Sequence, residues 1–264
     1  MAATFFRRLI ARLQPLDLPI VLPAHDKGQM PPGIRVYAVG DVHGRADLLR
    51  NALDIVDADI ASDPPEKPIF VGMGDFIDRG PESRSVLDIL SNIRDRSVLL
   101  KGNHEQILLS FLNDPVKTGP AWLETGGWEF LRSYGVRSRP HEKDRKELSR
   151  IRDDLVAKMP DRHLKLIKKL RLSQSIGGYF FAHAGARAGV PLDQQSEEDL
   201  LWIRKGFSDK DEPFEKIVVH GHTPVTVPYV GLNRINIDTG AYATGKLTLV
   251  ILQGLGVRFV HVGA

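Results

Sequence analysis

The sequence predicts an α/β fold in a single domain, and two observations support this class. Short runs of β-branched and apolar residues alternate with segments of helical length and periodicity, a pattern typical of β-α-β units and of a largely parallel sheet. The 264 residues are 42% hydrophobic and 26% charged. The chain therefore has enough apolar side chains to form a core and is not disordered.

The elements follow one another from residue 34 onward. A β-branched run at 34–39 predicts a buried strand, and apolar residues at a helical spacing predict a helix at 45–60. We then expect a strand at 69–71, a helix at 82–96 and a strand at 98–100. Residues 118–169 are predicted to be mostly helical, with a solvated helical face at 141–169. The last predicted strands lie at 179–182, 217–219, 234–237 and 247–252.

The chain is expected to have one domain, because no linker or internal repeat divides it. This domain covers residues 34–264 and includes a helical insertion around 115–171. Residues 1–33 are predicted to be a loosely ordered arm, in which a short basic amphipathic stretch precedes five prolines. The arm lacks the features of a signal peptide, and no apolar run approaches the roughly 18 residues of a membrane-spanning helix. We therefore expect no stable membrane insertion.

The composition excludes several kinds of chemistry. The chain has no cysteine, which rules out disulfides, thiolate zinc sites, iron–sulfur clusters and a cysteine nucleophile. The same fact fits a reducing compartment, so a cytoplasmic protein is expected. The net charge of +3 comes from basic residues scattered among acidic ones. No groove-reading motif or stacking platform is present, and nucleic acid is not an expected partner.

Five glycine-flanked polar motifs follow predicted strands. Open α/β sheets place their sites at the carboxyl ends of strands, so these motifs are expected to converge. In each motif a carboxylate, amide or imidazole lies in a sharp glycine turn, where backbone can approach closely. The motifs are Gly40-Asp41-Val42-His43-Gly44, Gly74-Asp75-Phe76-Ile77-Asp78-Arg79-Gly80, Gly102-Asn103-His104-Glu105, Phe181-Ala182-His183-Ala184-Gly185 and His220-Gly221-His222-Thr223-Pro224.

The donor types in these motifs indicate a metal centre. Carboxylate, amide oxygen and imidazole together suit Mn, Fe or Zn better than a calcium site. The candidate ligands are too many for one tetrahedral ion, whereas two ions that share a carboxylate would use them all. The candidates are Asp41, His43, Asp75, Asn103, His183 and His222.

The motif series resembles the calcineurin-like metallophosphoesterase superfamily, whose signature is GDxHG, GDxxDRG, GNHE, a lone His and a final GH. The DRG ending and the intact GNHE resemble in particular the PPP-type serine/threonine phosphoprotein phosphatases and their bacterial relatives. That branch also includes symmetrical diadenosine tetraphosphate hydrolases. The match runs from about residue 34 to residue 252. The resemblance implies a central β-sandwich of two mixed sheets flanked by helices.

The resemblance also implies a role for each ligand. Asp41 and His43 would hold the first ion, and Asp75 would bridge both ions. The second ion would be completed by Asn103, His183 and His222. A hydroxide activated by the two ions would attack phosphorus in line, without a phosphoenzyme. Two Mn²⁺ ions are the expected cofactors, with Fe or Zn as alternatives.

Four predicted catalytic residues accompany the ligands. His104 resembles the general acid that protonates the leaving group, and Asp78 would hold its imidazole. Arg79 would bind phosphate oxygens together with Asn103. Bacterial relatives have an arginine in a segment similar to Leu200-Leu201-Trp202-Ile203-Arg204, so Arg204 is predicted to be a second phosphate clamp. The alternative for Arg204 is a surface arginine at a helix end.

Other notable residues have plainer interpretations. His220 is expected to pack behind the site rather than to bind metal. The histidines expected at the surface are His25, His141, His163 and His261. Trp122, Trp128 and Tyr134 have near-helical spacing, which fits packing of a small helical cap. A role in stacking a base or holding a peptide stays open for these three residues.

The predicted function is that of a metal-dependent phosphomonoesterase, a serine/threonine protein phosphatase. The alternative is a diadenosine tetraphosphate (dinucleoside polyphosphate) hydrolase, because both activities use the same ligands. A non-catalytic phosphoprotein binder is disfavoured, since all candidate ligands, His104 and both arginines are present. The expected partner is a phosphorylated protein or a small phosphoester, and the chain is expected to be a monomer.

Overall fold

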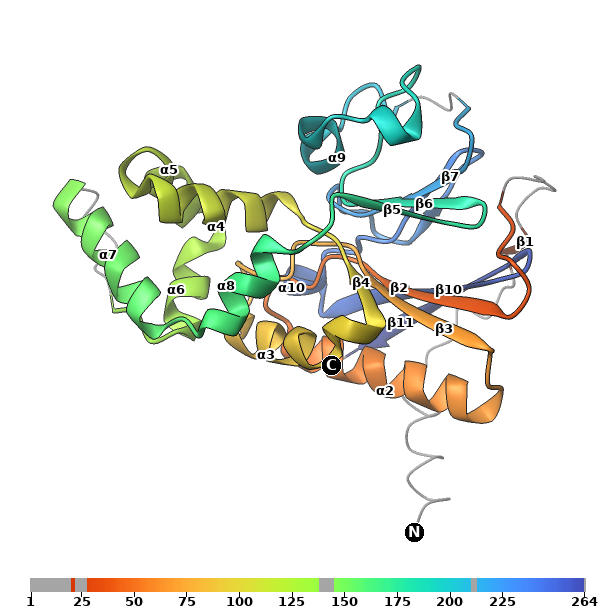
Figure 1. Cartoon of the computed structure of the whole chain (residues 1–264), viewed down its shortest axis with the longest axis horizontal. Helices are drawn as coiled ribbons and strands as arrows, with labels where there is room; N and C mark the ends of the chain where they lie inside the picture. The colour runs from red at the N-terminus through yellow and green to blue at the C-terminus, as the bar shows by residue number, and fades with distance from the viewer. Residues whose placement is uncertain (1–19, 22–27, 138–144, 210–212, 264) are drawn as a thin grey trace, which may run out of the picture.

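Two β-sheets face each other in the computed structural model, and helices flank them (Figure 1). The structure describes residues 20–21, 28–137, 145–209 and 213–263. The expected sandwich of two mixed sheets flanked by helices is confirmed. Most of the predicted N-terminal arm lies outside the described residues, as do His25 and His141.

The larger sheet has six strands in the order β1-β11-β10-β2-β3-β4. Its parallel part consists of β2 (Ile34–Val39), β3 (Lys67–Gly72) and β4 (Ser97–Leu99). Its antiparallel part consists of β10 (Lys246–Gln253), β11 (Gly256–Gly263) and β1 (Ile20–Val21). Within the larger sheet, the expectation of a largely parallel arrangement thus holds for three of the six strands. The missed strand β11 follows β10 through a tight turn, and such a hairpin connection is necessarily antiparallel.

The smaller sheet has five strands in the order β5-β6-β7-β9-β8. They are β5 (Ser173–Ile176), β6 (Tyr179–Ala182), β7 (Ile217–His220), β8 (Tyr229–Val230) and β9 (Arg234–Asn236). The predicted strands match β6, β7 and β9. The sequence pattern did not predict β5 or β8, because β5 is polar and β8 has only two residues, too few for a periodic pattern.

The helices are unevenly distributed around the sheets (Figure 1). The helices along the larger sheet are α2 (Ala46–Ser62) and α3 (Ser83–Ile93), followed by the short η1 (Arg94–Arg96). A group to one side consists of α4 (Asn103–Asn113), α5 (Pro115–Trp122), the turn η2 (Leu123–Gly127), α6 (Trp128–Ser133), α7 (Arg145–Lys158) and α8 (Asp161–Lys168). The short helices near the smaller sheet and the carboxyl-terminal strands are η3 (Leu192–Gln194), α9 (Glu197–Trp202) and α10 (Ala241–Thr244). Within the described ranges, no helix has both the length and the apolar character needed to cross a bilayer.

Side chains along each strand alternate between two cores. Val36 and Ala38 of β2 pack between the sheets, whereas Tyr37 and Val39 pack on the opposite face, against α2 and α3. In β6, Phe181 likewise lies between the sheets. Because both faces of these strands are buried, their sequences are nearly continuous apolar runs. Because the strands are buried on both faces, their ends are held in place, and the polar motifs begin at these ends.

One expectation about the charged helical segment is wrong. His163 in α8 is fully buried, although a surface position was predicted. Its Nδ1 lies 2.7 Å from the Tyr134 hydroxyl, and its Nε2 lies 3.0 Å from Asp88 Oδ1 in α3. These partners satisfy both ring nitrogens, which is the condition for burying an imidazole.

Candidate metal centre and active site

The five polar motifs converge where strands of both sheets end. Asp41, Asp75 and His222 follow β2, β3 and β7 within three residues, Asn103 begins α4 after β4, and His183 directly follows β6. All five side chains are buried. Residues 181 positions apart are brought into contact, because the His222 backbone N–H donates to Asp41 Oδ2 at 3.1 Å.

The turns that carry these side chains are strained. In the described part of the chain, every non-glycine residue with a positive φ belongs to the motifs. These residues are His43, Asp75, Asp78, Arg79 and His222. A left-handed backbone costs such residues about 1–2 kcal/mol each. Concentration of this strain in one place supports a functional role for the site.

Two glycines let carboxylates lie directly against the backbone. A Cβ atom on Gly102 would come within 2.1 Å of Asp75 Oδ1, and one on Gly221 within 2.1 Å of Asp41 Oδ1. Glycine is therefore required at both positions for the carboxylates to keep their places.

His43, Asp75 and His104 form a first group of potential metal ligands, whose donor atoms lie within 4.8 Å of one another. Asp75 Oδ2 is 3.4 Å from His43 Nε2 and 3.9 Å from His104 Nε2. The Nδ1 of His43 lies 2.8 Å from the Ile77 carbonyl, which can only accept, so Nδ1 carries the proton. Burial lowers the pKa of His43 to about 3. His43 is therefore neutral, with an Nε2 lone pair available to a metal ion.

Asp75, His183 and His222 form a second group, and the amide of Asn103 lies among them. Asn103 Oδ1 is 3.0 Å from His183 Nε2 and 2.9 Å from His222 Nδ1. His183 Nδ1 lies 3.0 Å from the Met73 carbonyl and donates to it, so His183 Nε2 has no proton. An imidazole lone pair and an amide oxygen at 3.0 Å repel each other unless a cation lies between them. This donor set therefore fits a divalent metal ion.

Asp75 belongs to both groups. Its Oδ1 lies 3.4 Å from His183 Nε2, whereas its Oδ2 faces the first group. Burial alone would raise the pKa of Asp75, but the imidazoles of His183, His104 and His43 bring it below the ordinary value. The carboxylate is thus charged and has one oxygen facing each group, as a bridging ligand requires.

Asp41 lies beside the second group without belonging to either. Its Oδ1 is buried without a hydrogen-bond partner and lies 4.0 Å from His183 Nδ1. Burial raises the pKa of Asp41 well above its ordinary value, and the carboxylates of Asp238 and Asp75 raise it further. A buried carboxylate with one oxygen left without a hydrogen bond is costly and would be stabilised by a cation.

His104 is held by Asp78 at the edge of the first group. His104 Nδ1 lies 2.7 Å from Asp78 Oδ2, and the Trp122 indole N–H donates to the same oxygen at 2.8 Å. Burial lowers the pKa of His104, but the carboxylates of Asp75 and Asp78 bring it above the ordinary value. His104 therefore differs from the neutral imidazoles beside it, because its surroundings favour the protonated form.

Trp122 is fully buried, which confirms the packing interpretation and excludes stacking on a substrate. Its contact with Asp78 was missed, since nothing in the sequence signals a hydrogen bond across 44 positions. Glu105 was also missed as a support. Its buried carboxylate accepts from the backbone N–H groups of Asp75, Phe76, Ile77 and Gly102 and so ties two motifs together.

Two arginines lie beside the ligand groups. Arg79 Nη1 is 3.1 Å from His43 Nε2, and Nη2 is 3.1 Å from His104 Nε2. The Arg79 guanidinium lies 4.8 Å from the ring centre of Tyr242, a partly exposed residue that no sequence motif indicated. Arg204 is exposed, and its Nη2 donates to the His222 carbonyl at 3.3 Å.

His220 lies in neither ligand group. Its ring is buried and packs at 4.8 Å against Phe207, and its Nδ1 contacts the Gly221 carbonyl. Asp238 lies near Asp41 and accepts from the backbone N–H of Gly240 at 2.9 Å. Both residues therefore lie next to the ligand turns and belong to neither ligand group.

Comparison with known proteins gives relatives that match most of this chain. A serine/threonine-protein phosphatase 2 of Escherichia coli is 29% identical over 81% of this chain and 90% of its own length. A serine/threonine-protein phosphatase 1 of Salmonella typhimurium is 31% identical over 83% and 92%. The asymmetrical bis(5'-nucleosyl)-tetraphosphatase PrpE of Anoxybacillus flavithermus is 28% identical over 80% and 87%.

Solved structures share the fold. A crystal structure described as that of a candidate diadenosine tetraphosphatase superposes with a TM-score of 0.59 at 20% identity and covers 94% of this chain and 96% of its own. The family described as calcineurin-like phosphoesterase matches residues 34–262. With its motifs at the ends of the strands and most of its length matched, the chain belongs to the calcineurin-like phosphoesterase family.

Proposed function

We propose that this phosphoesterase is a serine/threonine protein phosphatase with two divalent metal ions, Mn²⁺ being the first choice. Family membership makes it a hydrolase of phosphoesters. The observation that carries the proposal is that Asp75 is shared by two groups of potential ligands, the first of which includes His104, with Arg79 beside it. Two relatives named serine/threonine-protein phosphatases, each matched over at least 90% of its length, support the choice of substrate.

We assign the ligands to the two ions as the resemblance implies, which places Asp41 with the first ion although its Oδ1 lies beside the second group. The first ion would be held by Asp41, His43 and Asp75. The second would be held by Asp75, Asn103, His183 and His222. When bound, the two ions would neutralise phosphate charge and lower the pKa of a water molecule that attacks phosphorus.

The protein's own groups bind the phosphate and supply a proton. The Arg79 guanidinium offers two N–H groups, which lie against His43 and His104 and which a phosphate would accept in their place. Arg204 would approach from the side of His222. Asp78 holds the His104 imidazole through Nδ1. Once a phosphate accepts the Arg79 N–H groups, His104 Nε2 is no longer their acceptor, so it can carry a proton and give it to the leaving serine or threonine oxygen.

A substrate panel tests this proposal. Metal-stripped protein is reconstituted with Mn²⁺, Fe²⁺ or Zn²⁺ and assayed with phosphoserine peptides, phosphothreonine peptides, diadenosine tetraphosphate and para-nitrophenyl phosphate. We expect kcat/KM to be higher for the phosphopeptides than for the dinucleotide. The reverse order would contradict the choice of substrate, and absence of all hydrolysis in protein that holds two ions would contradict the reaction.

A diadenosine tetraphosphate hydrolase is the second candidate, and one observation favours it. Two partly exposed aromatic rings flank the ligand groups: Tyr242 lies 5.4 Å from the His43 ring, and Trp202 lies 6.3 Å from the His222 ring. Rings in these positions can stack on adenine. Substituting both with Ala would then reduce dinucleotide cleavage by a much larger factor than para-nitrophenyl phosphate hydrolysis.

The proposal also includes a monomeric, cytoplasmic protein whose partner is a phosphorylated protein. Size-exclusion chromatography with light scattering tests the oligomeric state. A stable dimer at micromolar concentration would contradict it.

A further inference from the structure

β4 leaves part of a sheet edge unpaired. It is the outermost strand of the larger sheet, and β3 pairs with its inner side. On the outer side, the Arg171 N–H donates to the Leu99 carbonyl at 3.0 Å, and the Lys101 N–H donates to the Arg171 carbonyl at 2.7 Å. Peptide groups of alternate residues point to the same side of a strand. The N–H of Leu99 and the carbonyl of Ser97 therefore also face outward, where no other strand of the described residues pairs with them.

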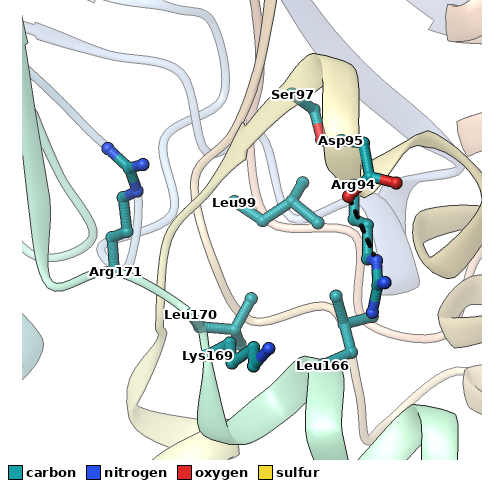
Figure 2. Close-up of a pocket in the computed structure, with 8 residues that line it drawn as sticks. All are labelled: Arg94, Asp95, Ser97, Leu99, Leu166, Lys169, Leu170 and Arg171. Carbon is teal, nitrogen blue, oxygen red and sulfur yellow. Dashed lines mark ion pairs between the residues drawn. The ribbon is translucent and has the colours of Figure 1, made fainter.

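A pocket of about 230 Å³ adjoins this free edge (Figure 2). The end of α8 and the residues after it form the opposite wall. Leu99, Leu166 and Leu170 surround a common space in Figure 2 and give the pocket an apolar floor. The Ser97 hydroxyl, also in the lining, is buried without a hydrogen-bond partner. Main-chain groups, an unsatisfied hydroxyl and a site for an apolar side chain thus lie together.

The rim of this pocket is basic. Arg94, Lys169 and Arg171 line it, against a single carboxylate from Asp95. Asp95 lies 3.3 Å from Arg94 Nε and is almost fully exposed. Outside the pocket, Lys168 of α8 is exposed and adds further positive charge. Such a field favours an anionic partner.

We propose that an extended acidic segment of the phosphoprotein substrate docks in this pocket by adding a short strand to β4. Its main chain would pair with the Leu99 N–H and the Ser97 carbonyl, and one aliphatic side chain would enter the leucine floor. Flanking carboxylates would pair with Arg94 and Lys169. This inference rests on the proposed protein phosphatase function, because it assigns the segment to the substrate.

The charge of the pocket favours an acidic substrate segment over the N-terminal segment of the chain itself. Residues 1–14 contain three arginines and no acidic residue, so the basic rim repels them. The pocket is also within reach of the metal centre. Leu99 and the ligand Asn103 are four residues apart in the chain, a distance of at most about 14 Å. A substrate docked at β4 can therefore present a phosphorylated residue a few positions away to the catalytic groups.

Fluorescence anisotropy with the full, metal-loaded protein tests the docking site. The probe is a labelled, unphosphorylated peptide of alternating glutamate and leucine. We expect saturable binding, which backbone N-methylation of the peptide weakens. The double substitution Arg94→Glu/Lys169→Glu should weaken binding about tenfold or more, because two charge-assisted contacts are lost. The matched control Lys165→Glu/Lys168→Glu makes the same change of charge outside the pocket and should retain most of the affinity.

Kinetics separate this site from the catalytic function. A phosphopeptide that carries the acidic segment should have a lower KM than the same phosphopeptide without it, and Arg94→Glu/Lys169→Glu should remove the difference. Turnover of para-nitrophenyl phosphate should be unchanged in both double variants. Equal loss of affinity in the two variants, or tighter binding of a single-stranded oligonucleotide than of the peptide, would overturn the docking site. Absence of any phosphoester hydrolysis, with selective peptide binding retained, would contradict the proposed function instead.

Discussion

The position of the proton on each imidazole decides what the histidines of the centre can do. His43 and His183 both direct Nδ1 at a backbone carbonyl, which leaves Nε2 as a lone pair. Burial lowers the pKa of both residues. His104 instead directs Nδ1 at a carboxylate, and Asp75 and Asp78 outweigh its burial and raise its pKa. The partner of Nδ1 thus decides the role of each histidine. A backbone carbonyl leaves His43 and His183 as neutral ligands, whereas a carboxylate makes His104 a proton donor.

Replacing His104 with Asn tests the acid role. Turnover should fall by about 10²-fold or more, because protonation of the leaving group is lost. Metal content should stay at the wild-type level by inductively coupled plasma mass spectrometry. The substitution His261→Asn, on the distant strand β11, should leave turnover unchanged. Full activity of the His104 variant would remove the assignment.

Tyr242 tests how Arg79 is positioned. Its ring lies 4.8 Å from the guanidinium carbon, and a cation–π contact at such an exposed site contributes about 0.5–1 kcal/mol. Tyr242→Leu should therefore raise KM for para-nitrophenyl phosphate about two- to fivefold with little change in kcat. Tyr242→Phe keeps the aromatic face and should behave like the wild type. Equal effects of the two substitutions would show that the hydroxyl or the volume matters instead.

At the scale of elements, the end of α5 and the turn η2 brace the catalytic loop after β3. Trp122 donates to Asp78, and the Gly126 carbonyl accepts the Arg79 backbone N–H at 3.2 Å. Gly126 has a φ of 117°, a conformation that other residues rarely adopt. The helical segment thus contributes to the site through two contacts rather than through a ligand.

Trp122→Phe isolates one of these contacts, because phenylalanine keeps an aromatic ring but has no N–H. The loss of a hydrogen bond to a buried carboxylate should lower the free energy of unfolding by about 1–3 kcal/mol. It should also reduce kcat, since Asp78 orients His104. Urea denaturation and steady-state kinetics measure the two effects. The exposed Trp202→Phe substitution is the control for stability, and equal stability of the Trp122 variant and the wild type would contradict the bracing role.

The contact between α8 and α3 predicts a pH dependence of stability. Burial lowers the pKa of His163 below its ordinary value of 6.5, although Asp88 opposes this shift. Tyr134, Arg84 and Arg162 are the other titratable or charged groups that face it. Because the unfolded chain takes up the proton first, stability should fall as the pH drops below about 6.5 and should level off above it.

Urea denaturation between pH 5 and pH 7.5 measures this effect. His163→Gln keeps hydrogen-bonding groups without a titration, so its stability should depend less steeply on pH than that of the wild type. Titration at the metal centre is common to both proteins and cancels in the comparison. Identical pH profiles would contradict the assignment to His163.

At the scale of the whole molecule, metal binding should stabilise the fold. Buried acidic side chains gather where the two sheets end, and they are Asp41, Asp75, Asp78, Glu105 and Asp238. Burial raises the pKa of Glu105 to about 8 and that of Asp238 to about 6. Without cations, these groups either repel one another or take up protons.

Removing the ions with a chelator should lower the melting temperature. An ion present at 100 times its Kd contributes about 2.7 kcal/mol, which corresponds to about 5–10 °C for a chain of this size. Differential scanning calorimetry of the stripped and the Mn²⁺-loaded protein measures the shift, and Asp75→Asn should abolish it. An unchanged melting temperature would show that the centre does not hold metal.

The sequence by itself determined the strands β2, β3, β4, β6, β7, β9 and β10, because their apolar runs and glycine ends reflect local burial. It also determined the candidate ligands, since each motif is a contiguous string of donor types in a glycine turn. The resemblance of the motif series to the calcineurin-like phosphoesterases then implied a sandwich of two mixed sheets. The periodicity of the sequence alone could not distinguish such a sandwich from a single parallel sheet.

Only the tertiary structure decided how side chains far apart in the chain meet. Trp122 reaches Asp78 across 44 positions, Tyr242 lies over Arg79, and His163 is buried rather than exposed. Each outcome depends on the packing of one element against another, and periodicity within an element carries no information about that partner. The free edge of β4 was also not predictable from the sequence, because the order of strands depends on the whole sheet.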